Sequence, residues 1–160
     1  MSRAGGDNLS LMTHGAKVNV VAAILERGGR FLLGKRSLHK QSAPGYWCPI
    51  SGRVEPGESQ ADAVVREVLE EVGIAVRAVA KVAECDTRDG SAVIHWWHEQ
   101  PLDATLARLA NDEHTELSWV STEEMKRLAP IFDEDVAIFE RFALDGRLPG
   151  DRPPCPAVKS

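Results

Sequence analysis

Three glutamates stand close together in a segment with helical character. Glu67, Glu70 and Glu71 are spaced three and four residues apart, which makes them neighbours on one side of an α-helix. Like charges at these spacings destabilise a helix by roughly 0.2–0.5 kcal/mol per pair, and no lysine is interleaved to offset them. Glu70 and Glu71 also fall in the last turn, where the helix dipole disfavours anions. A bound divalent cation would remove both penalties, so the spacing predicts a metal site, with a solvated charged face as the alternative.

The helix that must carry these glutamates is the clearest element in the sequence. It is predicted from Ser59 to Val72, because Ser59 can cap its start, no Pro or Gly interrupts it, and Gly73 follows its end. At about 100° per residue, its apolar side chains form one arc that should face a sheet, with the three glutamates opposite. The arc consists of Ala61, Val64, Val65, Val68, Leu69 and Val72.

The residues around this helix fit a longer pattern. From Gly52 to Ile74 the sequence reads GRVEPGESQADAVVREVLEEVGI. This segment resembles the Nudix box, Gly-x5-Glu-x7-Arg-Glu-U-x-Glu-Glu-x-Gly-U, in which U is a bulky apolar residue. Just before it, Ile50 and Ser51 replace two residues common in the family's Pro-Gly-Gly approach. All nine specified positions of the box are met, by Gly52, Glu58, Arg66, Glu67, Val68, Glu70, Glu71, Gly73 and Ile74.

The resemblance implies a metal-binding role for the box. Glu67 and Glu71 would be the main Mg²⁺ ligands, with Glu70 as a further ligand and Mn²⁺ as a substitute metal. Gly52 would offer its backbone carbonyl and leave room for the metal–phosphate cluster. Glu58 would be an outer ligand or the partner of the box arginine.

Catalysis would also need residues that organise the site and accept a proton. Arg66 would hold the glutamates in place by charge-assisted hydrogen bonds. The general base would come from the box, as Glu71, or from the later loop 111–116, where Glu113 and Glu116 are the candidates. The expected catalytic set is therefore Glu70, Glu71, Arg66 and Glu113.

The remaining elements predict how the helix is positioned. A short helix capped by Ser121 and Glu124 and a final helix over residues 133–144 are expected near the end. Residues 101–112 are ambiguous between helix and loop. The order of elements predicts an α/β (α+β) fold, which the resemblance makes a Nudix-type α/β/α sandwich with a central mixed β-sheet. Strands are predicted at residues 17–26, 30–35, 46–50, 74–84, 91–98 and 117–120.

Length and charge bound the domain and its partners. The 160 residues fit one domain, with the Nudix domain at 17–146 between a flexible N-terminal segment, 1–16, and an irregular Pro-rich tail, 147–160. The net charge of -5 argues against nucleic acid as a partner. No apolar stretch approaches the ~20 residues of a membrane span. A small nucleotide is the expected partner, and a homodimer is a further expectation because dimers are common among resembling proteins.

Two groups of residues outside the box have both a functional and a packing interpretation. His95 and Trp97 share one face of a predicted strand, and Trp96 and His98 share the other. Packing in the core or at its edge is favoured over a stacking role. His114 could contact a phosphate or be inert.

The cysteines indicate the compartment. Cys48, Cys85 and Cys155 are odd in number and irregularly spaced, which gives neither a disulfide framework nor a zinc pattern. Reduced thiols in a cytoplasmic protein are therefore expected, with Cys48 buried and inert.

The resemblance implies a Mg²⁺-dependent Nudix hydrolase, that is, a pyrophosphohydrolase. It would cleave a diphosphate linkage in a nucleoside diphosphate derivative or a nucleoside triphosphate by water attack at phosphorus. One alternative is a catalytically silent Nudix module that senses a nucleotide, but its usual sign, loss of a box glutamate, is absent here. Another is an isomerase of a small diphosphate, whose Cys and Glu context is not evident. The sequence specifies neither the substrate nor the bond that is cut.

Overall fold

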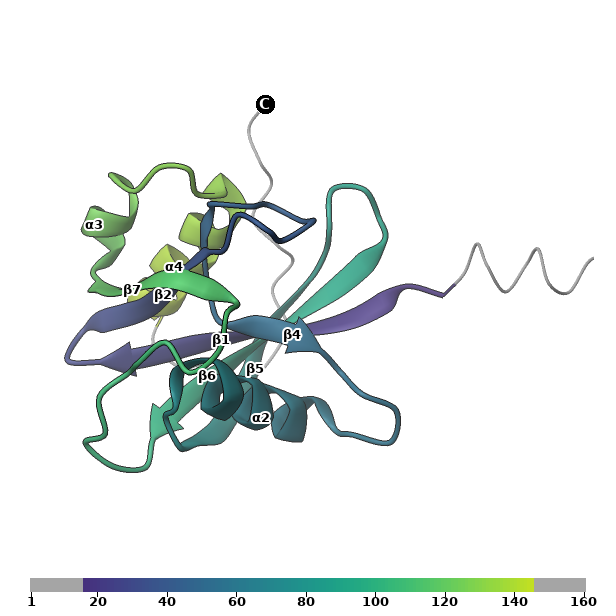
Figure 1. The fold of residues 1–160 in the computed structure, drawn as a ribbon, viewed down its shortest axis with the longest axis horizontal. Helices are drawn as coiled ribbons and strands as arrows, with labels where there is room; N and C mark the ends of the chain where they lie inside the picture. The colour runs from purple at the N-terminus through teal and green to yellow at the C-terminus, as the bar shows by residue number, and fades with distance from the viewer. Residues whose placement is uncertain (1–15, 146–160) are drawn as a thin grey trace, which may run out of the picture.

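A seven-stranded mixed sheet organises the protein (Figure 1). The computed structural model describes residues 16–145, so the expected tail and, apart from Ala16, the expected lead-in lie outside the described residues. The strands are β1 (Val18–Arg27), β2 (Arg30–Arg36), β3 (Trp47–Cys48), β4 (Ser51–Arg53), β5 (Val76–Asp86), β6 (Ala92–Pro101) and β7 (His114–Val120). Their order is β3-β2-β1-β6-β5, with β4 paired to β1 and β7 paired to β2.

Strand β1 is the centre of the sheet. It is antiparallel to β2 and β4 and parallel to β6. Its apolar run is buried on both faces, as expected for a strand covered from two sides. Val21, Ala23 and Leu25 enter one hydrophobic cluster, whereas Ala22 and Ile24 enter the other. The alternation of side chains along β1 therefore defines two cores, one on each face.

Helices cover both faces of the sheet. Helix α2 (Gln60–Val72) packs on the face that carries Val21, and α4 (Asp133–Asp145), preceded by the short α3 (Thr122–Met125), packs on the other. Figure 1 shows α2 on one side of the strands and α3 and α4 on the opposite side. The predicted sandwich with a central mixed sheet is confirmed. No helix among the described residues is long and apolar enough to cross a membrane.

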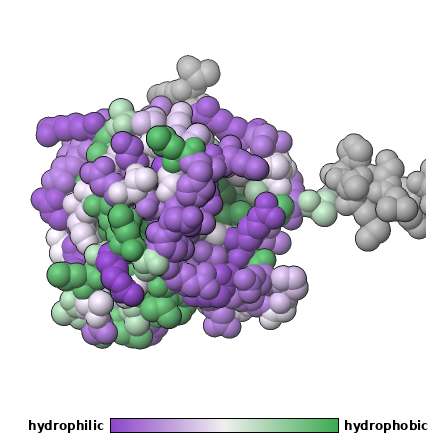
Figure 2. All heavy atoms as spheres, in the orientation of Figure 1, coloured by the Kyte–Doolittle hydropathy of each residue, from purple (hydrophilic) through white to green (hydrophobic). Residues whose placement is uncertain are grey.

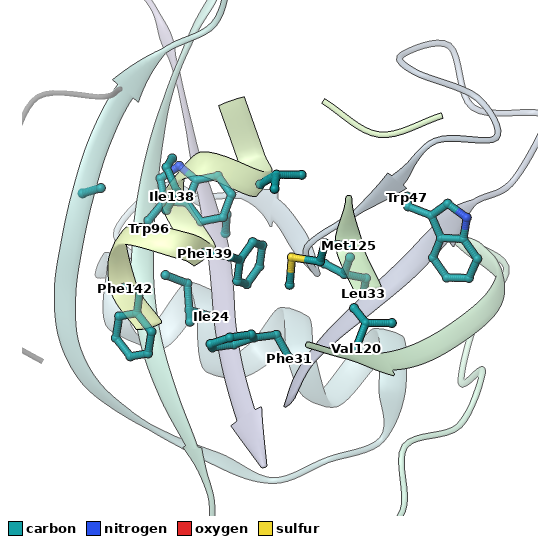
Figure 3. Close-up of a cluster of buried hydrophobic side chains, with 13 residues drawn as sticks. Ile24, Phe31, Leu33, Trp47, Trp96, Val120, Met125, Ile138, Phe139 and Phe142 are labelled. Carbon is teal, nitrogen blue, oxygen red and sulfur yellow. The ribbon is translucent and has the colours of Figure 1, made fainter. Parts of the chain in front are cut away.

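The aromatic residues of β6 pack against the helices. Trp96 meets Phe139 of α4 edge-to-face with ring centroids 5.7 Å apart, inside the cluster of Figure 3. The ring centroid of His98 lies 4.9 Å from that of Phe142, also in α4. On the opposite face, the indole nitrogen of Trp97 donates to a side chain of α2, and His95 is buried. The packing interpretation of these residues is confirmed.

Local signals predicted both helix starts correctly. The Ser59 hydroxyl accepts a hydrogen bond from the backbone N–H of Asp62 at 3.0 Å, and the Ser121 hydroxyl accepts one from that of Glu124 at 3.2 Å. Helix α2 ends at Gly73, which adopts the left-handed conformation at φ 70°. Glycine reaches this conformation without a steric penalty.

The expected orientation of α2 needs correction at two positions. Leu69, assigned to the apolar arc, is 53% exposed, whereas Glu71, assigned to the opposite side, is 4% exposed. At about 100° per residue, Glu71 falls only about 20° from Val64 and therefore borders the buried arc. Leu69 lies beyond Val65 at the other edge. The three glutamates are thus divided between a buried Glu71 and an exposed Glu70.

The ambiguous segment 101–112 forms no helix, and all of it after Pro101 is a loop. Strand β6 extends to Pro101, and the following chain crosses the end of α2. There the backbone N–H groups of Arg108 and Ala110 donate to the carbonyls of Val72 and Glu71, each at 3.0 Å. These contacts satisfy carbonyls that a helix end leaves unpaired. Figure 2 shows apolar surface at the lower left, where this loop runs in Figure 1. The exposed leucines of this region are Leu69, Leu102, Leu106 and Leu109.

The cysteines only partly follow expectation. Cys48 is a buried free thiol, and burial raises its pKa to about 12. Its interpretation as buried and inert is confirmed. Cys85 is disulfide-bonded, so the expectation of reduced thiols is wrong for this residue. Cys155 lies outside the described residues.

Adjacent positions on α2 provide a test of its orientation. Val68→Ala should lower the free energy of unfolding by roughly 2–3 kcal/mol, because it removes fully buried methyl groups and leaves a cavity. Leu69→Ala should change it by less than about 0.5 kcal/mol, as at other exposed positions. Urea unfolding of the two variants measures both values. Equal losses would contradict the orientation.

Glu99 is a buried carboxyl in the layer between the sheet and α2. It is 0% exposed and lies between Leu25 of β1 and Ala78 of β5. Neither of its carboxylate oxygens has a hydrogen-bond partner among the described residues. Burial raises its pKa to about 8. The folded protein therefore holds this proton more tightly than the unfolded chain does.

This difference predicts a pH dependence of stability. Since the folded-state pKa of Glu99 lies above the unfolded value of 4.5, its contribution is complete below pH 4.5 and is lost as the pH rises through about 8. Compared with Glu99→Gln, which does not titrate, the wild type should lose stability between pH 5 and pH 8.5. Chemical unfolding at the two pH values measures the difference. A constant difference would show that Glu99 does not titrate in this range.

Candidate active site

Arg66 is the centre of the hydrogen-bond network around α2. Its Nε and Nη2 donate to the two carboxylate oxygens of Glu58 at 2.7 and 2.9 Å. Its Nη1 donates to Glu67 at 2.8 Å and to Glu70 at 3.3 Å. Nη2 also donates to the backbone carbonyl of Arg53 in β4, at 3.1 Å. One guanidinium therefore joins the loop before α2, the helix and the sheet.

Glu58 and Arg66 form a fork-to-fork ion pair. Hydrogen bonds from Arg66 lower the pKa of Glu58 to about 2, and the hydrogen bonds to Glu58 raise the pKa of Arg66. Two parallel charge-assisted bonds fix the orientation of both groups. Of the two roles expected for Glu58, the structure shows the partnership with Arg66.

Gly52 allows Glu67 to lie directly against the sheet. Gly52 is in β4, opposite Val21 of β1. A Cβ atom added to Gly52 would lie 2.1 Å from Cδ of Glu67 and 2.3 Å from its Oε1. Any side chain at position 52 would therefore collide with the carboxylate. Glycine in a strand often marks such a close approach.

Glu67 and Glu71 are carboxylates with raised pKa values. Burial raises the pKa of Glu67 to about 7, against the lowering effect of the Arg66 hydrogen bond, and the charges of Glu71 and Glu70 raise it further. Burial also raises the pKa of Glu71. Two like charges are thus brought near each other with too little positive charge around them. A cation between them would favour their ionised forms.

The second contact of Glu71 comes from a distant strand. Nε2 of His114, the first residue of β7, lies 3.3 Å from Oε2 of Glu71, and both side chains are almost completely buried. The imidazole rests against Gly34 of β2. The sequence alone leaves the role of His114 open. Gly34, which follows three apolar residues in a predicted strand, is the signal in the sequence that another group approaches the backbone closely.

The two base candidates outside the box lie in different surroundings. Glu113 forms an ion pair with Lys40, and its charge contributes to the raised pKa of Glu71, so it lies beside the site. Glu116 is exposed and faces Lys35 in the pairing of β2 with β7. It belongs to the strand and not to the expected loop, because β7 begins at His114.

The donors around Gly52 and Glu67 suit a hard divalent cation. They are oxygen atoms, which Mg²⁺ prefers, and two of the carboxylates are partly desolvated. Among residues 16–145, no three His, Cys, Asp or Glu side chains converge in the present arrangement. Arg66 instead holds Glu67 and Glu70 by hydrogen bonds. A metal would therefore compete with Arg66 for these oxygens.

Comparisons with known proteins find similar sequences over most of the chain. The family model described as NUDIX domain matches residues 15–142. The CTP pyrophosphohydrolase of Escherichia coli K12 is 38% identical over 137 residues, which cover 84% of this chain and 98% of that protein. The nucleoside triphosphatase NudI of Salmonella agona is 28% identical over 141 residues, covering 81% of this chain and 96% of that protein.

A solved structure shows the same architecture. The MutT protein from Methanosarcina mazei Go1 superposes with a TM-score of 0.71 at 27% identity, covering 82% of this chain and 96% of that one. The family model spans most of the chain and includes the whole acidic site. The chain therefore belongs to the Nudix family and is a Nudix hydrolase.

Proposed function

We propose that this protein is a Mg²⁺-dependent pyrophosphohydrolase of nucleoside triphosphates. The observation that carries the proposal is the pair Glu67 and Glu71, two carboxylates whose pKa values are raised by burial. Glu67 lies directly against the backbone of Gly52. A metal–phosphate complex would supply the positive charge that this pair lacks and would fill the space that Gly52 leaves.

Several residues of the box would bind the metal together. Glu67 and Glu71 would be its main ligands, and Glu70 and the carbonyl of Gly52 would complete the protein's share. Mg²⁺ bound there, or Mn²⁺ in its place, supplies charge to neutralise phosphate oxygens and to activate a water molecule. Arg66 would keep Glu67 and Glu70 within reach while the metal is absent.

The printed names of two relatives favour a nucleoside triphosphate as substrate. One is called a CTP pyrophosphohydrolase and the other a nucleoside triphosphatase, and each is matched over nearly its full length. We therefore place CTP first among the substrates to be tested. In the proposed reaction, water attacks phosphorus, the anhydride bond between the α- and β-phosphates breaks, and the products are a nucleoside monophosphate and pyrophosphate.

A carboxylate of the site would accept the proton of the attacking water. Glu113 is the candidate outside the box, because its charge acts to raise the pKa of Glu71. Its ion pair with Lys40 holds the side chain at the edge of the site. Arg36 adds positive charge on the same side, since it acts to lower the pKa of Glu71.

Replacing the metal ligands should abolish turnover. Glu67→Gln and Glu71→Gln should each lower kcat by at least about 100-fold, because loss of metal-based charge stabilisation is worth several kcal/mol and about 1.4 kcal/mol is tenfold. Pyrophosphate release from CTP and the other nucleoside triphosphates with Mg²⁺ measures the effect. Glu55→Gln is the control, since Glu55 lies 3.8 Å from Arg66 and is mostly exposed. A wild type inactive on the whole panel would contradict the proposal.

The space beside Glu67 can be tested separately. Gly52→Ala would place a methyl group 2.1 Å from Cδ of Glu67, so the carboxylate must move. We expect kcat to fall at least about tenfold, as when a ligand is displaced by about 1 Å. Ser51→Ala in the same strand should leave kcat within twofold. Full activity of Gly52→Ala would show that Glu67 need not lie against β4.

A further inference from the structure

His114 is held in place by the sheet. It begins β7, opposite Arg36 of β2, where the register shifts between Lys35 and Arg36. A Cβ atom at Gly34 would lie 2.5 Å from Nδ1 of His114 and 2.7 Å from its Cγ. Only 3% of the His114 side chain is exposed. The imidazole therefore has little freedom to turn or withdraw.

The chain before His114 is also anchored near the site. The N–H of Ala110 donates to the carbonyl of Glu71 at 3.0 Å, and the N–H of Ser37 donates to the carbonyl of Glu113 at 2.9 Å. The segment 110–114 is thus tied at one end to α2 and at the other to the chain that follows β2. These two backbone hydrogen bonds place His114 beside the last turn of α2.

The hydrogen bond between His114 and Glu71 has one direction when Glu71 is ionised. A metal-binding carboxylate is deprotonated, and its oxygens then only accept. Nε2 of His114 must therefore carry the hydrogen. Nδ1, which faces Gly34, has no hydrogen-bond partner among the described residues. Within residues 16–145, the ring therefore forms its side-chain hydrogen bond through Nε2.

Glu71 depends on this donor more than the other box glutamates do. Arg66 donates to Glu58, Glu67 and Glu70. Within residues 16–145, the only side chain that hydrogen-bonds to the Glu71 carboxylate is His114. An unpaired buried carboxylate oxygen carries a large desolvation penalty. His114 satisfies Oε2 and leaves Oε1 available to a ligand.

We infer that His114 is a positioning residue of the Nudix site, which orients the Glu71 carboxylate for metal binding through the Nε2 hydrogen bond. The inference rests on the proposed function for its effect on catalysis. His114 acts through Glu71 and touches no substrate, so its loss should lower kcat and metal affinity while the KM for the nucleotide changes little.

Two substitutions of similar size separate positioning from packing. His114→Gln keeps an N–H donor near the position of Nε2, whereas His114→Leu fills the space without a donor. We expect Leu to weaken Mn²⁺ binding and to lower kcat by about 10–100-fold, the range for groups that orient metal ligands. His114→Gln should keep both its Mn²⁺ affinity and its kcat within a few-fold of the wild-type values. The KM for CTP should stay within twofold in both variants.

Gly34→Ala tests the same inference with the histidine present. The added methyl group would push the imidazole away from its place, so Mn²⁺ binding should weaken as in His114→Leu. Thr115→Ala, at the exposed neighbouring position of β7, is the control. Unfolding curves of all variants show how much of each sample is folded.

Calorimetric titration with Mn²⁺ alone keeps the inference separate from the proposed function. One outcome is that the wild type hydrolyses no nucleotide while His114→Leu weakens Mn²⁺ binding and His114→Gln does not. In that case the positioning role stands and the substrate proposal fails. If folded Leu and Gln variants bind Mn²⁺ as the wild type does, the inference is wrong whatever the activity. Equal weakening by Leu and Gln would also overturn it, because packing alone would then explain the loss.

Discussion

The fork of hydrogen bonds from Arg66 is the interaction on which the site depends. Without it, Glu58, Glu67 and Glu70 would face one another without a countercharge, and like charges this close destabilise a helix. Arg66 also reaches the carbonyl of Arg53, which ties the acidic face of α2 to the sheet. The guanidinium suits this position because its planar donors match carboxylate oxygens in pairs.

The double burial of β1 gives this network a fixed frame. Because β1 alternates between two cores, a register slip of one residue would exchange every side chain between faces. The pairing of Gly52 with Val21 is therefore strongly specified. That pairing places Gly52 on the face covered by α2, where Glu67 can approach the backbone. The stability of the sheet and the geometry of the acidic site thus depend on the same strand.

The loop 102–113 joins β6 to β7, crosses the end of α2 on the way and completes the site. It donates backbone hydrogen bonds to the last carbonyls of α2 and then delivers His114 to Glu71. Its side chains remain largely exposed, so backbone contacts hold much of it in place. Loops that are attached in this way tolerate changes of surface side chains better than the helices and strands that they connect.

The sequence by itself determined the short-range features of this protein. The caps of α2 and α3, most of the strands and the contiguous box residues depend on neighbours a few positions apart and could be predicted. The strand predicted at 46–50 is wrong, because the structure has two short strands there, β3 and β4, and β4 is fixed by its pairing with β1. Tertiary structure alone decided that Glu71 is buried while Leu69 is exposed, because the sheet covers only part of the apolar arc. It also decided the partners of Glu71 and Glu113, which lie 43 and 73 residues away in the chain. Helical and strand periodicity describe single elements, and they carry no information on which distant side chain fills the space beside each one.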